Sequence, residues 1–331
     1  MAHKPKITFS TNPNPRNRAL IDGSIAIDGY DLEYVGDKYS PGEMHYRFVQ
    51  GEFDVAEMST ATLMRAKEKG KRFAALPVFF QRGPRQRNIF CCQGKLNHPS
   101  ELRGKQIGAF RYGATAVSWA RGYLLDEHDI KTTDVGWFVS GKEVYIGNEL
   151  PVKVERLDPP PPFGQEKTHL ARLVSEGKLA AALVAGDSGY PGLFGGGTLP
   201  ATMGKSPGVM PLFDDTEEII RYVKRTQIYP IIHIVTVKEE TVDQYPDLPA
   251  KLIEAFREAN KLAANYFSAR DAEGYAKERD VLGFDPYAGV LTESDKKSIQ
   301  ALNRYQIEQG LVKKEIPLES LFVKEAFTMK G

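Results

Sequence analysis

Short apolar segments alternate with amphipathic ones through the N-terminal half of the chain, and this alternation restricts the fold most strongly. The expected strands cover residues 6–10, 31–35, 53–58 and 73–80. The expected helices between them lie around residues 16–25, 41–50 and 60–69. Strands that alternate with helices favour parallel βαβ units over an antiparallel sandwich. We therefore expect an α/β fold with mostly parallel sheets.

A second series of the same kind follows in the middle of the chain. Its expected strands cover residues 87–92, 105–110, 135–140, 152–157 and 229–237, and its expected helices begin at residues 115 and 168. Nearer the C-terminus, Leu252, Phe256, Ala259 and Ala263 share one face of a predicted helix. A chain of 331 residues is long enough for two lobes of ordinary size.

The composition limits the classes of binding partner and the cellular compartment that we expect for this protein. Lys and Arg (44) nearly balance Asp and Glu (43), so the net charge of +1 predicts neither nucleic acid nor a membrane surface as a partner. The N-terminus has no apolar signal segment, and no run of about 18 apolar residues occurs. We expect a cytoplasmic protein, although export of a precursor with a trimmed leader stays open. The adjacent Cys91 and Cys92 are expected as reduced thiols on a strand.

Two glycine-rich stretches raise the question of a phosphate site. The segment 108–122 reads as a strand, a small turn and a helix whose first N–H groups suit an anion, but it lacks a phosphate-loop lysine. In the segment 189–208, the Walker spacing requires a glycine where Leu199 stands. We interpret 189–208 as a surface loop or a lid, and the proline-rich 157–164 as a loop.

Charged side chains cluster at the expected strand ends. Arg82, Arg85 and Arg87 lie within six residues, and they are either solvated or a fork for carboxylates. Glu57 and Ser59 end a predicted parallel strand, the position where open α/β sheets bind ligands, although Glu57 could also be a capping residue or an ion-pair partner. These groups and the helix start predict a cleft for a small anionic ligand.

His233 lies inside an apolar predicted strand. It is either a core histidine bonded to a backbone group or a proton carrier that faces the cleft. The six histidines show no i, i+4 spacing with a carboxylate, so no metal site is predicted from spacing.

The order of motifs resembles the 4,5-dihydroxyphthalate decarboxylase family over nearly the whole chain. The matching segments are GEFDVAEMS (51–59), PVFFQRGPRQRNIF (77–90), ELRGKQIGAFRYGATAVSWARGYLLDEHDI (101–130), YPIIHIVTV (229–237) and GFDPYAGV (283–290). The spacing of Thr115-Ala116, Trp119 and Arg121-Gly122, followed by Asp126-Glu127, is the most specific part.

The resemblance implies an α/β, two-lobed type II periplasmic-binding-protein-like fold. Lobe one would comprise residues 1–88 and 236–331, and lobe two would comprise residues 89–235. The chain would then cross between the lobes near Arg87 and His233, which would place both side chains at the cleft.

The resemblance also implies a carboxy-lyase activity: 4,5-dihydroxyphthalate would give 3,4-dihydroxybenzoate (protocatechuate) and CO2 in the catabolism of phthalate. A ring hydroxyl para to the departing carboxylate supplies electrons, so the chemistry requires no cofactor, although a divalent metal stays open. His233 would donate the proton and Glu57 would contact the hydroxyl, or the reverse. The substrate contacts would be Ser59, Arg82, Arg85, Arg87, Tyr112, Thr115, Ala116, Trp119 and Asp285.

Two positions depart from the family pattern, because Gln86 stands where histidine is expected and Tyr287 where tryptophan is expected. A related aromatic acid is therefore an alternative substrate. The competing class is a non-catalytic solute-binding protein for a small carboxylate, and a different enzyme on the same fold is a third option. A homo-oligomer stays open.

Overall fold

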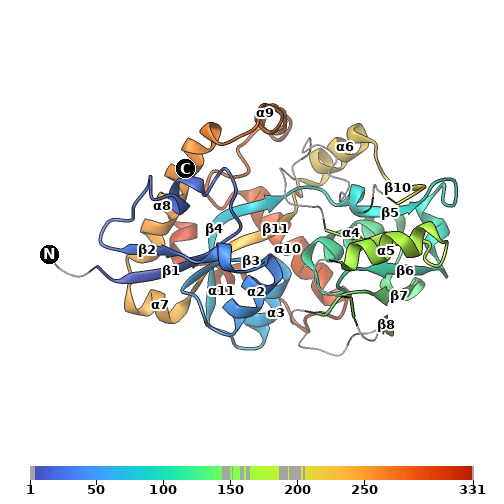
Figure 1. Ribbon diagram of the computed structural model, residues 1–331, viewed down its shortest axis with the longest axis horizontal. Helices are drawn as coiled ribbons and strands as arrows, with labels where there is room; N and C mark the ends of the chain where they lie inside the picture. The colour runs from blue at the N-terminus through green and yellow to red at the C-terminus, as the bar shows by residue number, and fades with distance from the viewer. Residues whose placement is uncertain are drawn as a thin grey trace.

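The computed structural model describes residues 4–143, 150, 152–156, 160–161, 165–185, 193, 203 and 206–329. Most of the loops expected at 157–164 and 189–208 lies outside these residues. Two β-sheets lie side by side along the long axis (Figure 1). Each sheet with its helices is called a lobe below, and the predicted two-lobed α/β architecture is confirmed.

The first lobe contains a five-stranded sheet. Its strands, in spatial order, are β2 (Asp31–Tyr34), β1 (Lys6–Ser10), β3 (Val55–Ser59), β11 (Ile231–Lys238) and β4 (Phe73–Arg82). β1 is parallel to β2 and β3, as βαβ units require. β11 is antiparallel to both β3 and β4. This late strand therefore joins the sheet between two early ones.

The second lobe contains a six-stranded sheet. Its strands, in spatial order, are β10 (Val209–Pro211), β5 (Ile89–Cys92), β9 (Ala181–Leu183), β6 (Gln106–Ala109), β7 (Gly136–Val139) and β8 (Val154–Arg156). The pairs from β9 to β8 are parallel, whereas β5 is antiparallel to both of its neighbours. Cys91 and Cys92 both lie in β5 and form no disulfide.

Helices surround both sheets. They are α1 (Arg18–Ile21), α2 (Pro41–Val49), α3 (Thr60–Glu68), α4 (Thr115–His128), α5 (Glu166–Ser175), α6 (Thr216–Thr226), α7 (Glu239–Gln244), α8 (Leu248–Lys261), α9 (Ala269–Leu282), α10 (Glu293–Glu308) and α11 (Leu318–Leu321). α1 is shorter than expected because Gly23, with φ 78°, lies just beyond its end. Within the described ranges, no helix is both long and apolar enough to cross a membrane.

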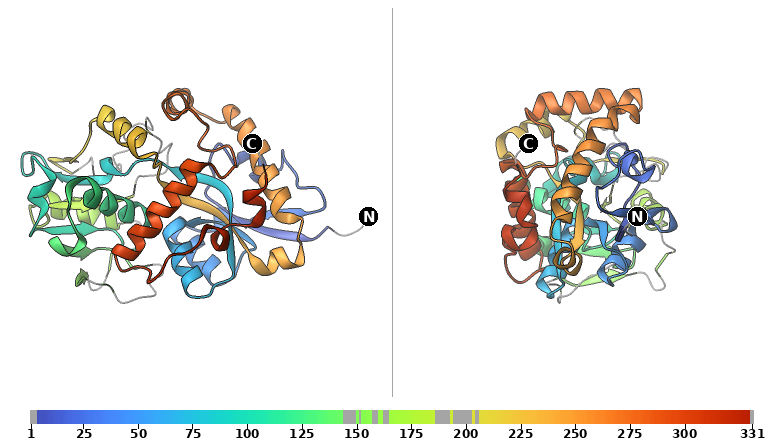
Figure 2. Two further views of the ribbon diagram at one scale, coloured as in Figure 1. Left: turned by 180° about the vertical axis from the view of Figure 1, so that it is seen from behind. Right: turned by 90° about the vertical axis from the view of Figure 1, so that its left-hand side faces the viewer.

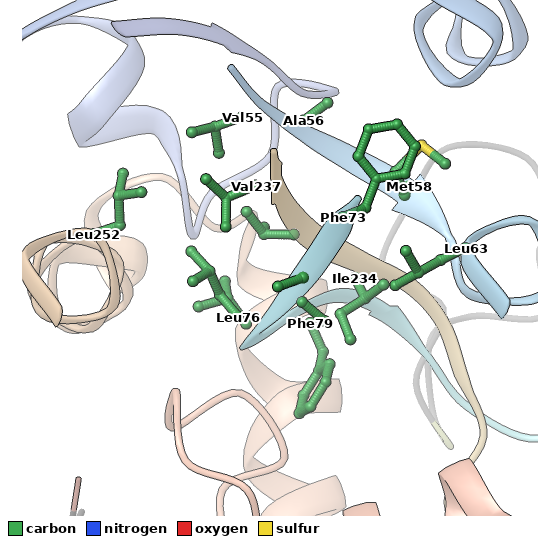
Figure 3. Packing of buried hydrophobic residues seen from close by; sticks show 14 of the residues in the cluster. Val55, Ala56, Met58, Leu63, Phe73, Leu76, Phe79, Ile234, Val237 and Leu252 are labelled. Atoms are coloured by element: carbon green, nitrogen blue, oxygen red, sulfur yellow. The ribbon is translucent and has the colours of Figure 1, made fainter. Parts of the chain in front are cut away.

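The core of the first lobe is formed by strand residues that face helices on both sides. Every residue of β3 is buried, which is typical of a central strand covered on both faces. Leu252 on α8 lies beside the strands that carry Val237 and Leu76 (Figure 3). The predicted apolar face of α8 is confirmed, because Leu252, Phe256 and Ala259 are all buried.

The return of the chain to the first lobe differs from the prediction. We expected this crossing near His233, with residues up to 235 in lobe two. β11 instead begins at Ile231 and pairs with β4 from that residue onward, so the return lies before Ile231. The other predicted lobe boundaries stay predictions. From behind, α10 runs across the middle of the molecule (Figure 2), where it contacts α3 of the first lobe and α4 of the second.

Candidate active site

A carboxylate and an imidazole meet on two neighbouring strands of the first lobe. Glu57 on β3 lies opposite Val235 on β11, so His233, two residues away, projects from the same face of the sheet. The Nδ1 atom of His233 lies 2.6 Å from Oε1 of Glu57. We call these two residues the Glu57–His233 pair. The structure thus gives His233 a carboxylate partner in place of a backbone group.

The loop that follows β1 holds the second oxygen of Glu57. The Oε2 atom accepts hydrogen bonds from Thr11 Oγ1 at 2.8 Å, from the Asn12 backbone N–H at 2.9 Å and from Asn12 Nδ2 at 3.2 Å. Burial alone would raise the pKa of Glu57, but the hydrogen bonds and the charge of His233 outweigh it and lower the pKa to about 2. Glu57 is therefore an ionised acceptor at neutral pH.

The protonation of Glu57 fixes the tautomer of its partner. An ionised carboxylate only accepts hydrogen bonds, so Nδ1 of His233 carries the hydrogen in this pair. The Nε2 atom, on the other side of the ring, is then the nitrogen that can take up and release a proton. This arrangement resembles the histidine–carboxylate part of a catalytic triad, in which a buried acid orients the imidazole. Both oxygens of Glu57 thus accept hydrogen bonds from the protein, and its contact with a substrate hydroxyl stays a prediction.

A second imidazole faces the pair. His45 lies on α2, which packs against β3, and its ring stands perpendicular to that of His233 with the ring centroids 4.9 Å apart. Burial lowers the pKa of His45 to about 3, and the charges of His233 and Arg111 act in the same direction. His45 is therefore neutral at physiological pH. Arg111 follows β6 of the second lobe, so its charge acts on His45 from the other lobe.

The start of α4 reaches the end of β3. Ser59 and Thr115 share a hydrogen bond of 2.7 Å between their hydroxyls, and Thr115 Oγ1 accepts the backbone N–H of Ala61 at 3.0 Å. The structure thus brings two predicted contacts together at the lobe junction, the place where the end of β3 meets the start of α4. Ala116, the next residue of α4, is buried.

Trp119 forms part of the packing between the lobes. Its Nε1 donates to the backbone oxygen of Ile231 at 3.1 Å, and its ring packs edge-on against Tyr305. The side chain is buried within the core of the first lobe. These contacts connect α4 to β11, and they assign Trp119 a structural role instead of the expected substrate contact.

The three clustered arginines have different surroundings. Arg82 is fully buried, and its Nη1 lies 2.6 Å from Oδ1 of Asp295 and 2.7 Å from the backbone oxygen of Pro286. Its Nη2 donates to the backbone oxygen of Tyr229 at 3.0 Å. The predicted carboxylate contact of Arg82 is thus made by Asp295 of the chain itself, and we assign Arg82 a structural role.

This buried ion pair has a measurable consequence for stability. We expect Asp295→Ala to lower the free energy of unfolding by about 3–5 kcal/mol, because Arg82 would be left charged and unpaired inside the protein. Urea denaturation followed by circular dichroism measures the change. The matched control is Asp214→Ala, which removes an exposed partner of Arg87 and should cost less than about 1 kcal/mol. Equal losses in the two variants would contradict the structural role of Arg82.

Arg85 has no carboxylate partner in the described part of the chain. It is buried, and its one hydrogen bond there is a long contact of 3.5 Å from Nη1 to Asn88 Oδ1. Burial lowers the pKa of Arg85 to about 10, while Tyr229 and Tyr287 partly offset the effect. The guanidinium is still protonated at neutral pH. Buried charges in proteins are almost always paired, so this one fits an anionic ligand.

The remaining predicted contacts lie in other networks. Arg87 binds Asp214 at 2.8 Å and Thr216 within the second lobe, and Tyr112 packs under the guanidinium of Arg121. Asp285 accepts the backbone N–H of Tyr287 at 2.8 Å. None of their described contacts reaches the Glu57–His233 pair. Sequence spacing cannot reveal the partners of Arg87, because they come from a distant part of the chain.

The sequence analysis missed three groups at this site: His45, Arg111 and the Thr11-Asn12 turn. The turn follows β1 at the same edge of the sheet as the end of β3, so the rule that selected Glu57 would also have selected it. His45 is a polar residue on the buried face of α2, between Met44 and Phe48. Within the described residues, no three His, Cys, Asp or Glu side chains are grouped as metal ligands.

Comparison of the sequence with curated proteins finds two relatives that share a name. The 4,5-dihydroxyphthalate decarboxylase of Comamonas testosteroni is 28% identical over 273 residues, which cover 81% of this chain and 79% of that protein. The protein of the same name from Pseudomonas putida is 30% identical over 144 residues, which cover 43% of this chain and 55% of that protein. No protein-family model matches the sequence.

Solved structures show the same fold at low sequence identity. The periplasmic aliphatic sulphonate binding protein SsuA from Escherichia coli matches with a TM-score of 0.59 and 12% identity over 97% of this chain and 93% of that one. The desulfurization enzyme DSZB matches with a TM-score of 0.56 and 13% identity over 98% of both chains. The chain thus has the two-lobed fold of periplasmic binding proteins. By sequence, it is similar to the two proteins named 4,5-dihydroxyphthalate decarboxylase.

Proposed function

We propose that this protein decarboxylates an aromatic dicarboxylic acid, with 4,5-dihydroxyphthalate as the first candidate and 3,4-dihydroxybenzoate and CO2 as products. The observation that carries the proposal is the Glu57–His233 pair, an oriented acid–base group next to the lobe junction. The names of the two sequence relatives support the reaction. The charge of Arg85, which has no carboxylate partner among the described residues, supports an anionic substrate.

In this mechanism, the protein supplies a proton to the ring. The hydroxyl para to the departing carboxylate donates electrons into the ring, and the carbon that bears the carboxylate takes the proton from Nε2 of His233. The bond from that carbon to the carboxylate then breaks, its electron pair returns to the ring, and CO2 leaves. Glu57 keeps Nδ1 of His233 protonated and stabilises the positive charge of the His233 imidazolium before the proton is transferred.

Arg85 is assigned to the carboxylate that stays on the ring. A planar guanidinium matches the two oxygens of a carboxylate. The ligand would supply the negative charge beside Arg85 that the described residues do not supply. A tight grip on the departing carboxylate would stabilise the substrate more than the transition state and slow the reaction. The hydroxyls of Ser59 and Thr115 remain proposed contacts at the lobe junction.

The Glu57 carboxylate makes stability depend on pH in a defined direction. Its pKa is lowered from 4.5 to about 2 in the folded protein, so its ionised form stabilises the fold above about pH 4.5. This contribution is lost as the pH falls from about 4.5 toward 2. We therefore expect Glu57→Gln to lower the free energy of unfolding at pH 7 by about 1–3 kcal/mol. The difference from the wild type should shrink through that range in urea denaturation. A difference independent of pH would contradict the ionised state of Glu57.

A non-catalytic solute-binding protein is the second candidate, because the fold is also that of SsuA. CO2 release from purified protein and 4,5-dihydroxyphthalate separates the two, measured without added metal and then with Mn²⁺ or Mg²⁺. Catalytic release supports the decarboxylase and indicates whether a divalent ion is needed. Tight binding without release in all three conditions supports the solute-binding protein. A cytoplasmic location and a homo-oligomer stay predictions.

A further inference from the structure

His45 carries a polar atom that the fold itself does not use. The side chain is 6% exposed, and within the described residues its buried Nε2 atom has no hydrogen-bond partner. A buried polar group without a partner costs about 1–3 kcal/mol of stability. A histidine kept only for packing could be replaced by phenylalanine without this loss. Because His45 lies next to His233, its Nε2 atom is a candidate for a contact with the substrate.

The groups around His45 determine the chemistry of its partner. His233 on β11 packs against its ring and is itself paired with Glu57 on β3, and the charge of Arg111 acts on it from the second lobe. A neutral imidazole has one donor and one acceptor, so it suits a hydroxyl group better than a carboxylate. The carboxylate of a ligand is matched instead by the buried charge of Arg85.

We propose that His45 determines specificity by hydrogen bonding through Nε2 to a ring hydroxyl of the substrate, so that the protein selects hydroxylated aromatic acids. This assignment rests on the proposed function. In decarboxylation, His233 must reach the carbon that bears the departing carboxylate, while the para hydroxyl lies across one benzene ring from it. The two imidazoles pack edge to face with their ring centroids 4.9 Å apart, so one bound aromatic ring beside them would contact both. His45 would then hold the hydroxyl that donates electrons.

The test compares the binding of two acids that differ only in their hydroxyls, 3,4-dihydroxybenzoate and benzoate, by titration calorimetry. We expect the wild type to prefer the hydroxylated acid. His45→Phe should weaken its binding roughly tenfold to a hundredfold and leave benzoate binding within about twofold, because the ring is kept and only the hydrogen bond is lost. His45→Gln, which keeps a polar group, should retain most of the preference.

A second measurement does not depend on a variant that folds. In the wild type, the ¹⁵N resonance of His45 Nε2 should shift on binding of 3,4-dihydroxybenzoate and stay unchanged with benzoate. Wild-type protein that binds both acids alike, or neither, overturns the assignment, as does an equal loss for both acids in His45→Phe. Preference for the hydroxylated acid without CO2 release would refute the decarboxylase and leave the role of His45 intact.

Discussion

His233→Ala should reduce the turnover number for 4,5-dihydroxyphthalate by about a hundredfold or more, because positioned proton transfer contributes about 10²–10⁴-fold to catalysis. The substitution removes the imidazole of His233, whose Nε2 atom is the ring nitrogen that does not contact Glu57. CO2 release under saturating substrate measures the effect. Substrate affinity should change much less, since the proton is transferred only in the transition state.

A matched variant separates chemistry from folding. His233→Ala leaves Glu57 buried without its imidazole partner, which also lowers stability. His233→Asn keeps a side-chain N–H that can donate to Glu57 but has no transferable proton at the Nε2 position. We expect the same loss of turnover with a smaller loss of stability. His169→Ala, in the second lobe on α5, should leave turnover within about twofold. Full activity of His233→Asn would end the assignment of the proton donor.

Arg85→Met should weaken substrate binding by roughly a hundredfold, about 3 kcal/mol, while the free protein stays as stable or becomes more stable. The two effects have opposite signs because the charge of Arg85 lacks a carboxylate partner in the described chain and gains one from the substrate. KM should rise with little change in kcat, since the retained carboxylate is held throughout the reaction. Steady-state kinetics and urea denaturation give both quantities.

The control for this variant is Arg82→Met, three residues earlier on the chain. Arg82 already has Asp295 as its partner, so its loss should lower the free energy of unfolding by about 3–5 kcal/mol. If Arg85→Met destabilises the free protein as strongly as Arg82→Met, Arg85 has a partner within the protein and not in the ligand. Unchanged substrate affinity in Arg85→Met would also contradict its role.

Local patterns in the sequence predict much of the fold. The helix expected to begin at Thr115 does begin there, after an extended Ala114, and it ends at His128, before Asp129 in the left-handed region. The place of β11 in the first sheet was predicted less well. A strand pattern shows that a segment is extended, but its antiparallel pairing with β3 and β4 is set by contacts with residues far away in the sequence.

In the candidate site, too, the local sequence predicts some features and distant contacts determine the others. Glu57 could be selected from its place at a strand end, and His233 from its place in an apolar strand. Their pairing, and the different surroundings of Arg82 and Arg85, depend on partners from distant elements. Three arginines within six residues have the same chemistry in the sequence, and burial together with Asp295 distinguishes them in the structure.

The most direct test of the proposed reaction is the product formed in D₂O from 4,5-dihydroxyphthalate, analysed by mass spectrometry and NMR. The account predicts one CO2 for each 3,4-dihydroxybenzoate, with one deuterium at the ring carbon that lost the carboxylate. His233→Asn should form this product at least about a hundredfold more slowly. Unchanged substrate recovered from a tight complex would contradict the account and identify a binding protein on this fold.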